Sequence, residues 1–193
     1  MQSKAAFLSM SQFLDDSNLV DQFKAGNNRE IPFTSIVKKY QERLYWHIRR
    51  MVVVHEDADD VLQNVFIKVW KGLEGFRGES QLSTWLYKIA TNETYTFLEN
   101  RKKRMAHSLD DVENDLANKI KADERFDGNK IEWKLELAIQ QLPNKQKTVF
   151  MLRYYDEMPY EEMSRVLGTS EGALKASYHH AVKKVEDFLL RQL

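Results

Sequence analysis

Apolar side chains recur every three or four positions along most of this chain, and that spacing places them on one face of an α-helix. The stretch Asp57–Gly72 shows this pattern, with an apolar face and a polar face on opposite sides. The apolar positions are Val61, Leu62, Val65, Phe66, Val69 and Trp70, and the polar positions are Asp60, Gln63, Asn64 and Lys68. Thr84–Leu98 repeats the pattern, and no segment alternates convincingly between apolar and polar residues. The sequence therefore predicts an all-α fold.

Glycine is concentrated between these two predicted helices. Three of the seven glycines of the chain are Gly72, Gly75 and Gly78. A glycine cluster between two periodic segments is typical of a loop, because glycine adopts backbone conformations that other residues avoid. We therefore expect a loop from Gly72 to Leu82.

The segment 131–193 predicts three or four more helices. Ile131–Leu142 ends before Pro143, since a proline disfavours helical conformation in the residue before it. Lys145–Tyr155 follows. Pro159–Leu167 begins with a proline, whose missing N–H costs nothing in the first turn of a helix.

A short turn separates the last two of these predicted helices. Gly168 suits the left-handed conformation that ends a helix, and Thr169 and Ser170 can cap Glu171–Leu190. Two helices joined by a short glycine-containing turn are typical of a helix-turn-helix, whose second helix enters the DNA major groove. A plain helical hairpin is the alternative. The small residues Ala173 and Ala176 permit a close helix crossing and favour the DNA-binding motif.

The charge distribution divides the chain. The totals are equal, with 29 basic and 29 acidic residues, but residues 1–104 carry 16 and 13 while residues 105–130 carry 4 and 7. The second segment is also poor in aromatic and β-branched residues, which indicates a flexible linker. We expect two small helical domains, 22–104 and 131–193, joined by the acidic linker 105–130 and preceded by an N-terminal extension, 1–21.

Composition excludes several classes of protein. The chain has no cysteine, which excludes disulfides, thiolate metal sites and a cysteine nucleophile. No apolar run reaches the ~18 residues of a membrane span, and the N-terminus lacks the features of a signal peptide. We therefore expect a cytoplasmic protein with no membrane span of its own.

Two clusters of charged residues are candidate functional sites, one for nucleic-acid binding and one for metal binding. Arg101–Arg104 and Lys88 interleave with aromatic residues, a combination that suits single-stranded nucleic acid through phosphate neutralisation and base stacking. The run His55–Asp60 places His55 and Asp59 one helical turn apart, so a metal-dependent hydrolase is an alternative. Against a metal site, the sequence offers no second set of ligands at a suitable spacing. The acidic residues are also explained by a helix start, because the helix dipole favours negative charge there. We expect no enzyme activity, no catalytic residue, no resident metal and no cofactor.

The order of the motifs resembles one protein family. Asp57–Trp70, Phe76–Ser80 and Ser83–Asn92 resemble region 2 of bacterial sigma factors. Leu142-Pro143, with Pro159–Gly168 and Ser170–Lys175, resembles region 4. Because only a short linker separates these blocks, the chain resembles an extracytoplasmic-function (ECF) sigma factor over roughly residues 22–193.

This resemblance implies a transcription initiation factor that directs RNA polymerase core enzyme to specific promoters. Its core-binding residues would be Asp60, Gln63 and Asn64, which would face the clamp coiled coil of the β′ subunit; the β flap is a further expected contact. The −10 element would be held by Phe76, Arg77, Ser80, Lys88, Asn92, Arg101 and Arg104, with a flipped base captured by the loop. The −35 element would be contacted by Ser170, Glu171, Gly172, Lys175, His179 and Lys183.

The resemblance also implies an anti-sigma factor as a partner. A stand-alone helix-turn-helix regulator, which binds duplex operators as a dimer, is the alternative function. With zero net charge, the free chain is expected to bind DNA poorly.

Overall fold

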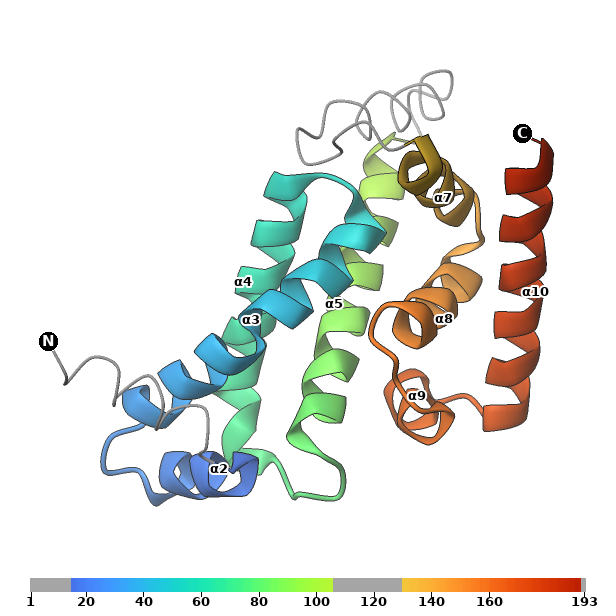
Figure 1. Cartoon of the computed structure of the whole chain (residues 1–193). Helices are drawn as coiled ribbons and strands as arrows, with labels where there is room; N and C mark the ends of the chain where they lie inside the picture. Colours follow the sequence, from blue (N-terminus) through green and yellow to red (C-terminus); the bar gives the residue numbers. More distant parts are fainter. Residues whose placement is uncertain (1–14, 106–129, 192–193) are drawn as a thin grey trace, which may run out of the picture.

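The computed structural model describes residues 15–105 and 130–191, and these residues contain helices and no strand (Figure 1). The helices are α2 (Asp16–Ala25), α3 (Glu30–Val52), α4 (His55–Gly72), the short 3-10 helix η1 (Leu73–Gly75), α5 (Leu82–Met105), α7 (Lys130–Gln140), α8 (Asn144–Tyr154), α9 (Tyr160–Leu167) and α10 (Glu171–Arg191). The all-α prediction is confirmed. The expected linker lies outside the described residues, apart from its two ends, which are helical.

Helices α2 to α5 form a first group whose buried apolar residues pack together. The core-facing positions of α4 include Val61, Val65 and Val69, which are almost fully buried, as the helical spacing predicted. Helix α5 is longer than the predicted Thr84–Leu98. It begins at Leu82 and continues through a basic C-terminal turn to Met105.

Helix α2 begins before the expected start of the first domain at residue 22. Its residues Leu19 and Phe23 are 1% exposed and belong to the core of the first group. Phe23 packs edge-on against Trp70 of α4, with 5.1 Å between ring centroids. Residues 16–21 are therefore part of this helical group. The remainder of the expected N-terminal extension lies outside the described residues.

Helices α7 to α10 form the second group, and its turn has the geometry of a helix-turn-helix. Gly168 ends α9 in the left-handed conformation, with a φ of 63°. Ser170 caps α10 by accepting a hydrogen bond from the backbone N–H of Ala173 at 3.4 Å. Pro159 precedes the first residue of α9 and does not lie within its first turn. The helix-ending role of Gly168 and the capping role of Ser170 are as the sequence predicted.

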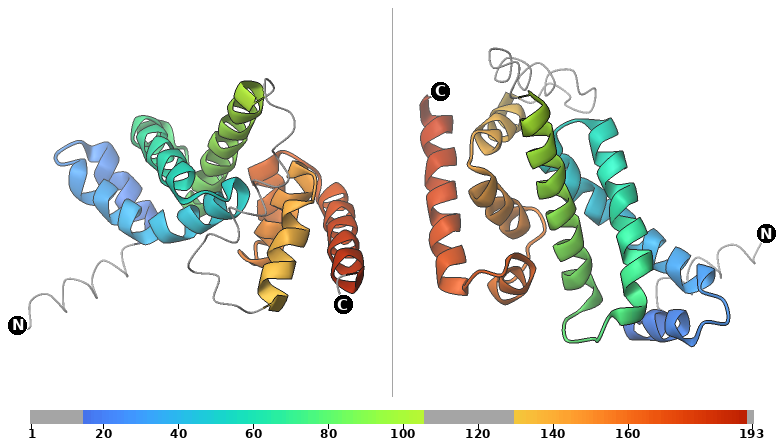
Figure 2. Two further views of the ribbon diagram at one scale, coloured as in Figure 1. Left: turned by 90° about the horizontal axis from the view of Figure 1, so that it is seen from above. Right: turned by 180° about the vertical axis from the view of Figure 1, so that it is seen from behind.

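The two groups pack against each other. Figure 2 shows α7 to α10 along one side of α5, with α10 on the far side of α8 and α9. Helix α5 contacts α9, and α3 contacts α8. One continuous apolar core includes Leu86 and Ala90 of α5 together with Met163 of α9. None of the helices in the described part of the chain is long and apolar enough to cross a membrane.

Phe23→Ala tests whether α2 belongs to the packed structure. Removing this buried ring leaves a cavity beside Trp70, so we expect the free energy of unfolding to fall by about 3–5 kcal/mol in chemical denaturation. The matched control is Gln22→Ala on the exposed side of α2, with an expected change within about 0.5 kcal/mol. Equal effects for the two variants would contradict this role of α2.

Candidate nucleic-acid interface

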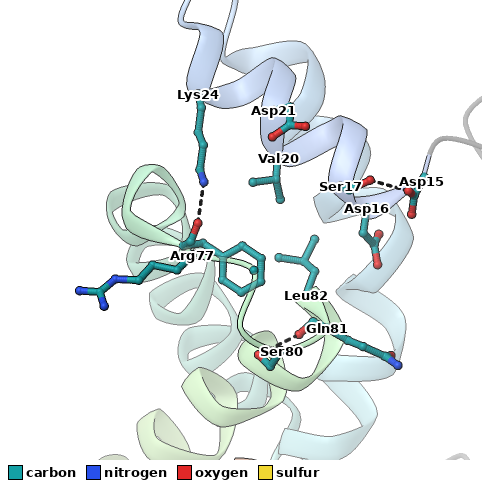
Figure 3. A pocket seen from close by; sticks show the side chains of 12 residues that line it. Asp15, Asp16, Ser17, Val20, Asp21, Lys24, Arg77, Ser80, Gln81 and Leu82 are labelled. Atoms are coloured by element: carbon teal, nitrogen blue, oxygen red, sulfur yellow. Dashed lines mark hydrogen bonds between the residues drawn. The ribbon is translucent and has the colours of Figure 1, made fainter.

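The loop between α4 and α5 forms a pocket together with α2. The pocket has a volume of about 430 Å³ and is lined by residues 15–17, Val20, Asp21 and Lys24 on one side and by residues 76–78 and 80–82 on the other (Figure 3). This volume is within the usual range for small-ligand sites. Phe76, Arg77 and Ser80, which the sequence analysis assigned to the −10 element, line this pocket, and Arg77 extends outward from the loop (Figure 3).

Helix α2 fixes the position of this loop. The Lys24 ammonium donates a hydrogen bond of 2.6 Å to the backbone carbonyl of Phe76 (Figure 3). Arg29, just after α2, makes a two-pronged ion pair with Glu74, with N–O distances of 3.0 and 3.1 Å. Sequence reasoning missed this wall of the pocket. The periodic spacing of Leu19, Val20 and Phe23 is the signal that could have found it.

Aromatic packing anchors the base of the loop. The ring of Phe76 lies against Trp85 of α5, with 5.2 Å between centroids, and both residues are only partly buried. A Cβ at Gly72 would come within 3.2 Å of the Trp85 ring, so a larger residue there would push the ring away. Gly78 adopts a φ of 73°, which is costly for residues other than glycine. The glycine cluster therefore serves both close packing and backbone geometry.

The predicted cationic positions of α5 differ in their surroundings. Lys88, Asn92 and Arg104 are exposed. Arg101 is half-buried and donates hydrogen bonds to the carbonyl of Val52 at 3.2 Å and to the Asp57 carboxylate at 3.1 Å. The structure thus leaves Lys88 and Arg104 accessible to a phosphate, whereas Arg101 already ties α5 to the α3–α4 connection.

The predicted −35 residues lie at the start of α10 and along its exposed side as far as Lys183. Ser170, Glu171, Gly172, Lys175, His179 and Lys183 are all exposed. The Lys175 ammonium lies 3.5 Å from the Glu171 carboxylate and 5.5 Å from the centroid of the Tyr160 ring. The inner side of α10, with buried Leu174, Ala181 and Val185, packs against the other helices of the second group. The exposed side carries these polar residues together with the small residues Ala173 and Ala176.

The outer face of α4 carries the predicted core-binding residues. Asp60, Gln63 and Asn64 are exposed on the side opposite the buried valines. Two large apolar residues, Ile67 at 46% and Trp70 at 39%, are exposed at the C-terminal end of the same helix. The outer face of α4 is therefore polar over its first half and partly apolar at its C-terminal end.

His55, the central residue of the alternative metal site at His55–Asp60, contacts other protein groups. His55 Nδ1 is 2.6 Å from the Tyr45 hydroxyl, and its Nε2 is 3.4 Å from the Asp59 carboxylate. Within residues 15–105 and 130–191 no group of three or more His, Asp or Glu side chains is placed to hold a metal ion. The two nitrogens of His55 therefore have protein partners.

Comparison with known proteins covers both helical groups. The family model "Sigma-70 region 2" matches residues 36–104, and "Sigma-70, region 4" matches residues 132–185. RNA polymerase sigma-H factor of Pseudomonas aeruginosa is 32% identical over 90% of this chain and 93% of its own length. ECF RNA polymerase sigma-E factor of Haemophilus influenzae is 28% identical over 92% and 97%. The chain belongs to the ECF sigma factors.

Solved structures share the fold of this sigma factor. CnrH in complex with the cytosolic domain of CnrY gives a TM-score of 0.68 at 21% identity, covering 92% of this chain and 99% of that one. RpoE in complex with the anti-sigma factor NepR from Bartonella quintana gives 0.65 at 18% identity, covering 81% and 96%. Because the sequence matches extend over both halves, the stand-alone regulator is not favoured.

Arg101 and Arg104 of this sigma factor provide a matched pair for a stability test. Arg101→Ala removes two hydrogen bonds between α5 and the α3–α4 connection, so we expect a loss of about 1–2 kcal/mol in the free energy of unfolding. Among the residues that the structure describes, exposed Arg104 bonds the carbonyl of Asn100 on its own helix, so Arg104→Ala should change stability by less than about 0.5 kcal/mol. A larger loss for Arg104→Ala would refute the structural role of Arg101.

Proposed function

We propose that this sigma factor is a dissociable promoter-specificity subunit that binds core RNA polymerase, contacts −35 duplex DNA through α10 and opens the −10 region by holding non-template bases. It performs no covalent chemistry itself. The observation that carries the proposal is the order of two sigma regions on one chain. Most of the expected contact residues are exposed, with Phe76, Ser80 and Arg101 partly buried.

The pocket between α2 and the 76–82 loop is the proposed site for a flipped base. Taking a base out of the stack costs a few kcal/mol, and a pocket that contacts the base can offset that cost. Ser80 and Gln81 supply polar atoms on the loop side, and Lys88 and Asn92 lie further along the exposed side of α5. Arg104 extends the cationic surface for phosphates upstream.

The −35 element is the proposed ligand of α10. The N-terminus of this helix follows the Gly168 turn and is exposed, as major-groove docking requires. The ion pair with Glu171 and the ring of Tyr160 position the Lys175 ammonium on the exposed side of α10.

Core polymerase and an anti-sigma factor are the proposed protein partners. The exposed face of α4 supports the first, since Asp60, Gln63 and Asn64 lie together on it. The second is supported by the fold neighbours, of which RpoE was solved with an anti-sigma factor. A bacterial sigma factor works beside the polymerase, so we place this chain in the cytoplasm.

In vitro transcription from a genomic fragment library tests the proposed function. With core polymerase and this chain together, we expect transcripts from a restricted set of promoters that neither component produces alone. Binding to duplex operators without polymerase, with no such transcripts, would instead indicate a stand-alone regulator.

Lys175→Ala and Lys88→Ala separate the two DNA contacts. Loss of Lys175 should weaken polymerase-dependent binding about fivefold or more on an intact −35 element and leave a scrambled one unchanged. Loss of Lys88 should weaken binding equally on both and reduce the salt slope by about 1. Lys184→Ala, an exposed α10 residue bonded to Gln146, is the control. Identical profiles for Lys175→Ala and Lys88→Ala would overturn the assignment of α10.

Asp60→Lys tests the core-binding face. A reversed charge at a protein interface costs affinity, so we expect the Kd for core polymerase to rise by at least about tenfold, measured with purified core enzyme in the absence of DNA. Asp187→Lys, an equal charge reversal on the exposed surface of α10, should leave that Kd unchanged. If the Asp60 and Asp187 variants bind core polymerase equally well, α4 is not the contact.

A further inference from the structure

Two basic residues at the C-terminal end of α2 hold the start of the pocket loop. The Lys24 ammonium donates a hydrogen bond of 2.6 Å to the carbonyl of Phe76 (Figure 3), and the Arg29 guanidinium pairs with Glu74 at 3.0 and 3.1 Å. Gly26 ends α2 with a φ of 80°, a left-handed conformation that turns the chain between the two basic residues. We call Lys24 and Arg29 the loop brace.

The loop brace is itself anchored to the core of the first group. The Arg29 guanidinium lies 5.3 Å from the centroid of the Phe23 ring, which is within the range of a cation–π interaction. That ring is 1% exposed and packs edge-on against Trp70 of α4. Because a close-packed interior leaves such a ring little freedom, the position of α2 is well defined, and the brace passes that position on to the loop.

The segment that follows Phe76 has fewer contacts with other elements. Among the residues that the structure describes, the hydrogen bonds and ion pairs of residues 77–81 stay within the loop and the first turn of α5. The ion pair is the one between Arg77 and Glu79, at 3.6 Å on the exposed surface. The chain becomes buried again at Leu82, which is 3% exposed. The bond from Lys24 is therefore the point at which α2 sets the position of the pocket-lining segment.

The function proposed for this pocket makes the position of the loop part of its affinity. A loop that becomes ordered only on binding loses affinity, because the ordering cost is subtracted from the contacts that it makes. Capture of a base also has to offset the cost of unstacking that base. A brace that places the loop in advance removes the first of these two costs.

We propose that Lys24 is a positioning residue for base capture, which fixes the loop in its receiving conformation by holding the carbonyl of Phe76. Arg29 and Glu74 provide the second point of support. This inference rests on the proposed function. The match to sigma region 2 begins at residue 36, so the loop brace precedes the matched segment. In this role the Lys24 charge is used on a backbone carbonyl, so it adds no phosphate contact.

Lys24→Met tests this role, because it removes the ammonium and keeps an unbranched side chain. In forked promoter DNA, each non-template nucleotide of the −10 element is replaced in turn by an abasic nucleotide, and binding by the chain with core polymerase is measured. The unaltered chain should lose affinity strongly at the position of the captured base. For Lys24→Met we expect about tenfold weaker binding to the intact fork, as loss of one charge-assisted hydrogen bond allows, and a correspondingly smaller loss at that position.

Lys39→Met is the matched control. It also removes an ammonium that bonds to α2, but its partner is Asp16, at 2.7 Å, rather than the loop. Asp16 keeps its hydrogen bond from the Tyr40 hydroxyl. We expect this variant to bind the intact fork as the unaltered chain does and to keep the same abasic profile. Glu74→Gln, which weakens the second support, should change the profile in the same direction as Lys24→Met.

Several outcomes would overturn the positioning role and leave the proposed function intact. One is an unchanged abasic profile in Lys24→Met, and another is an equal loss of affinity on every fork, including the one that lacks the captured base. A salt slope reduced by about 1 in Lys24→Met would indicate a direct phosphate contact instead. If the unaltered chain showed no position-specific loss at all, base capture itself would be refuted, and the role of Lys24 with it.

Discussion

Helix α5 is the element on which both helical groups depend. Leu86 and Ala90 have no exposed surface, and the same helix meets α3 and α4 on one side and α9 on the other. Its third side remains exposed and carries Lys88 and Asn92. Because one helix supplies core, inter-group contact and candidate DNA surface, its residues cannot follow a simple amphipathic pattern. The position of the pocket loop and of α9 follows from where α5 lies.

The sequence predicted the helices well wherever a residue had a single role. The valines of α4 face one core and its polar residues face solvent, so spacing alone identified both sides. Gly168 and Ser170 act through local backbone chemistry, which neighbouring residues determine. The resemblance to sigma factors, borne out by both region matches and the relatives, supplied the order and identity of the regions.

The parts that spacing could not predict depend on long-range contacts. Arg101 belongs to a basic run that suggested phosphate binding, yet its guanidinium bonds Val52 and Asp57, more than forty residues earlier in the chain. Lys24 reaches the carbonyl of Phe76 in the same way. Nothing in the composition near His47 indicates that Asp156 will face it. Such pairings are set by how helices dock, and local periodicity does not encode docking.

Charge gives the free chain one reason to bind DNA weakly. The net charge of zero limits counterion release, which supplies much of the affinity for DNA. Linking two sites multiplies affinity when both are engaged together. Under the proposed function, one chain bound to core polymerase contacts two promoter elements, so its affinity for a promoter comes from the assembled complex and exceeds that of either DNA surface alone.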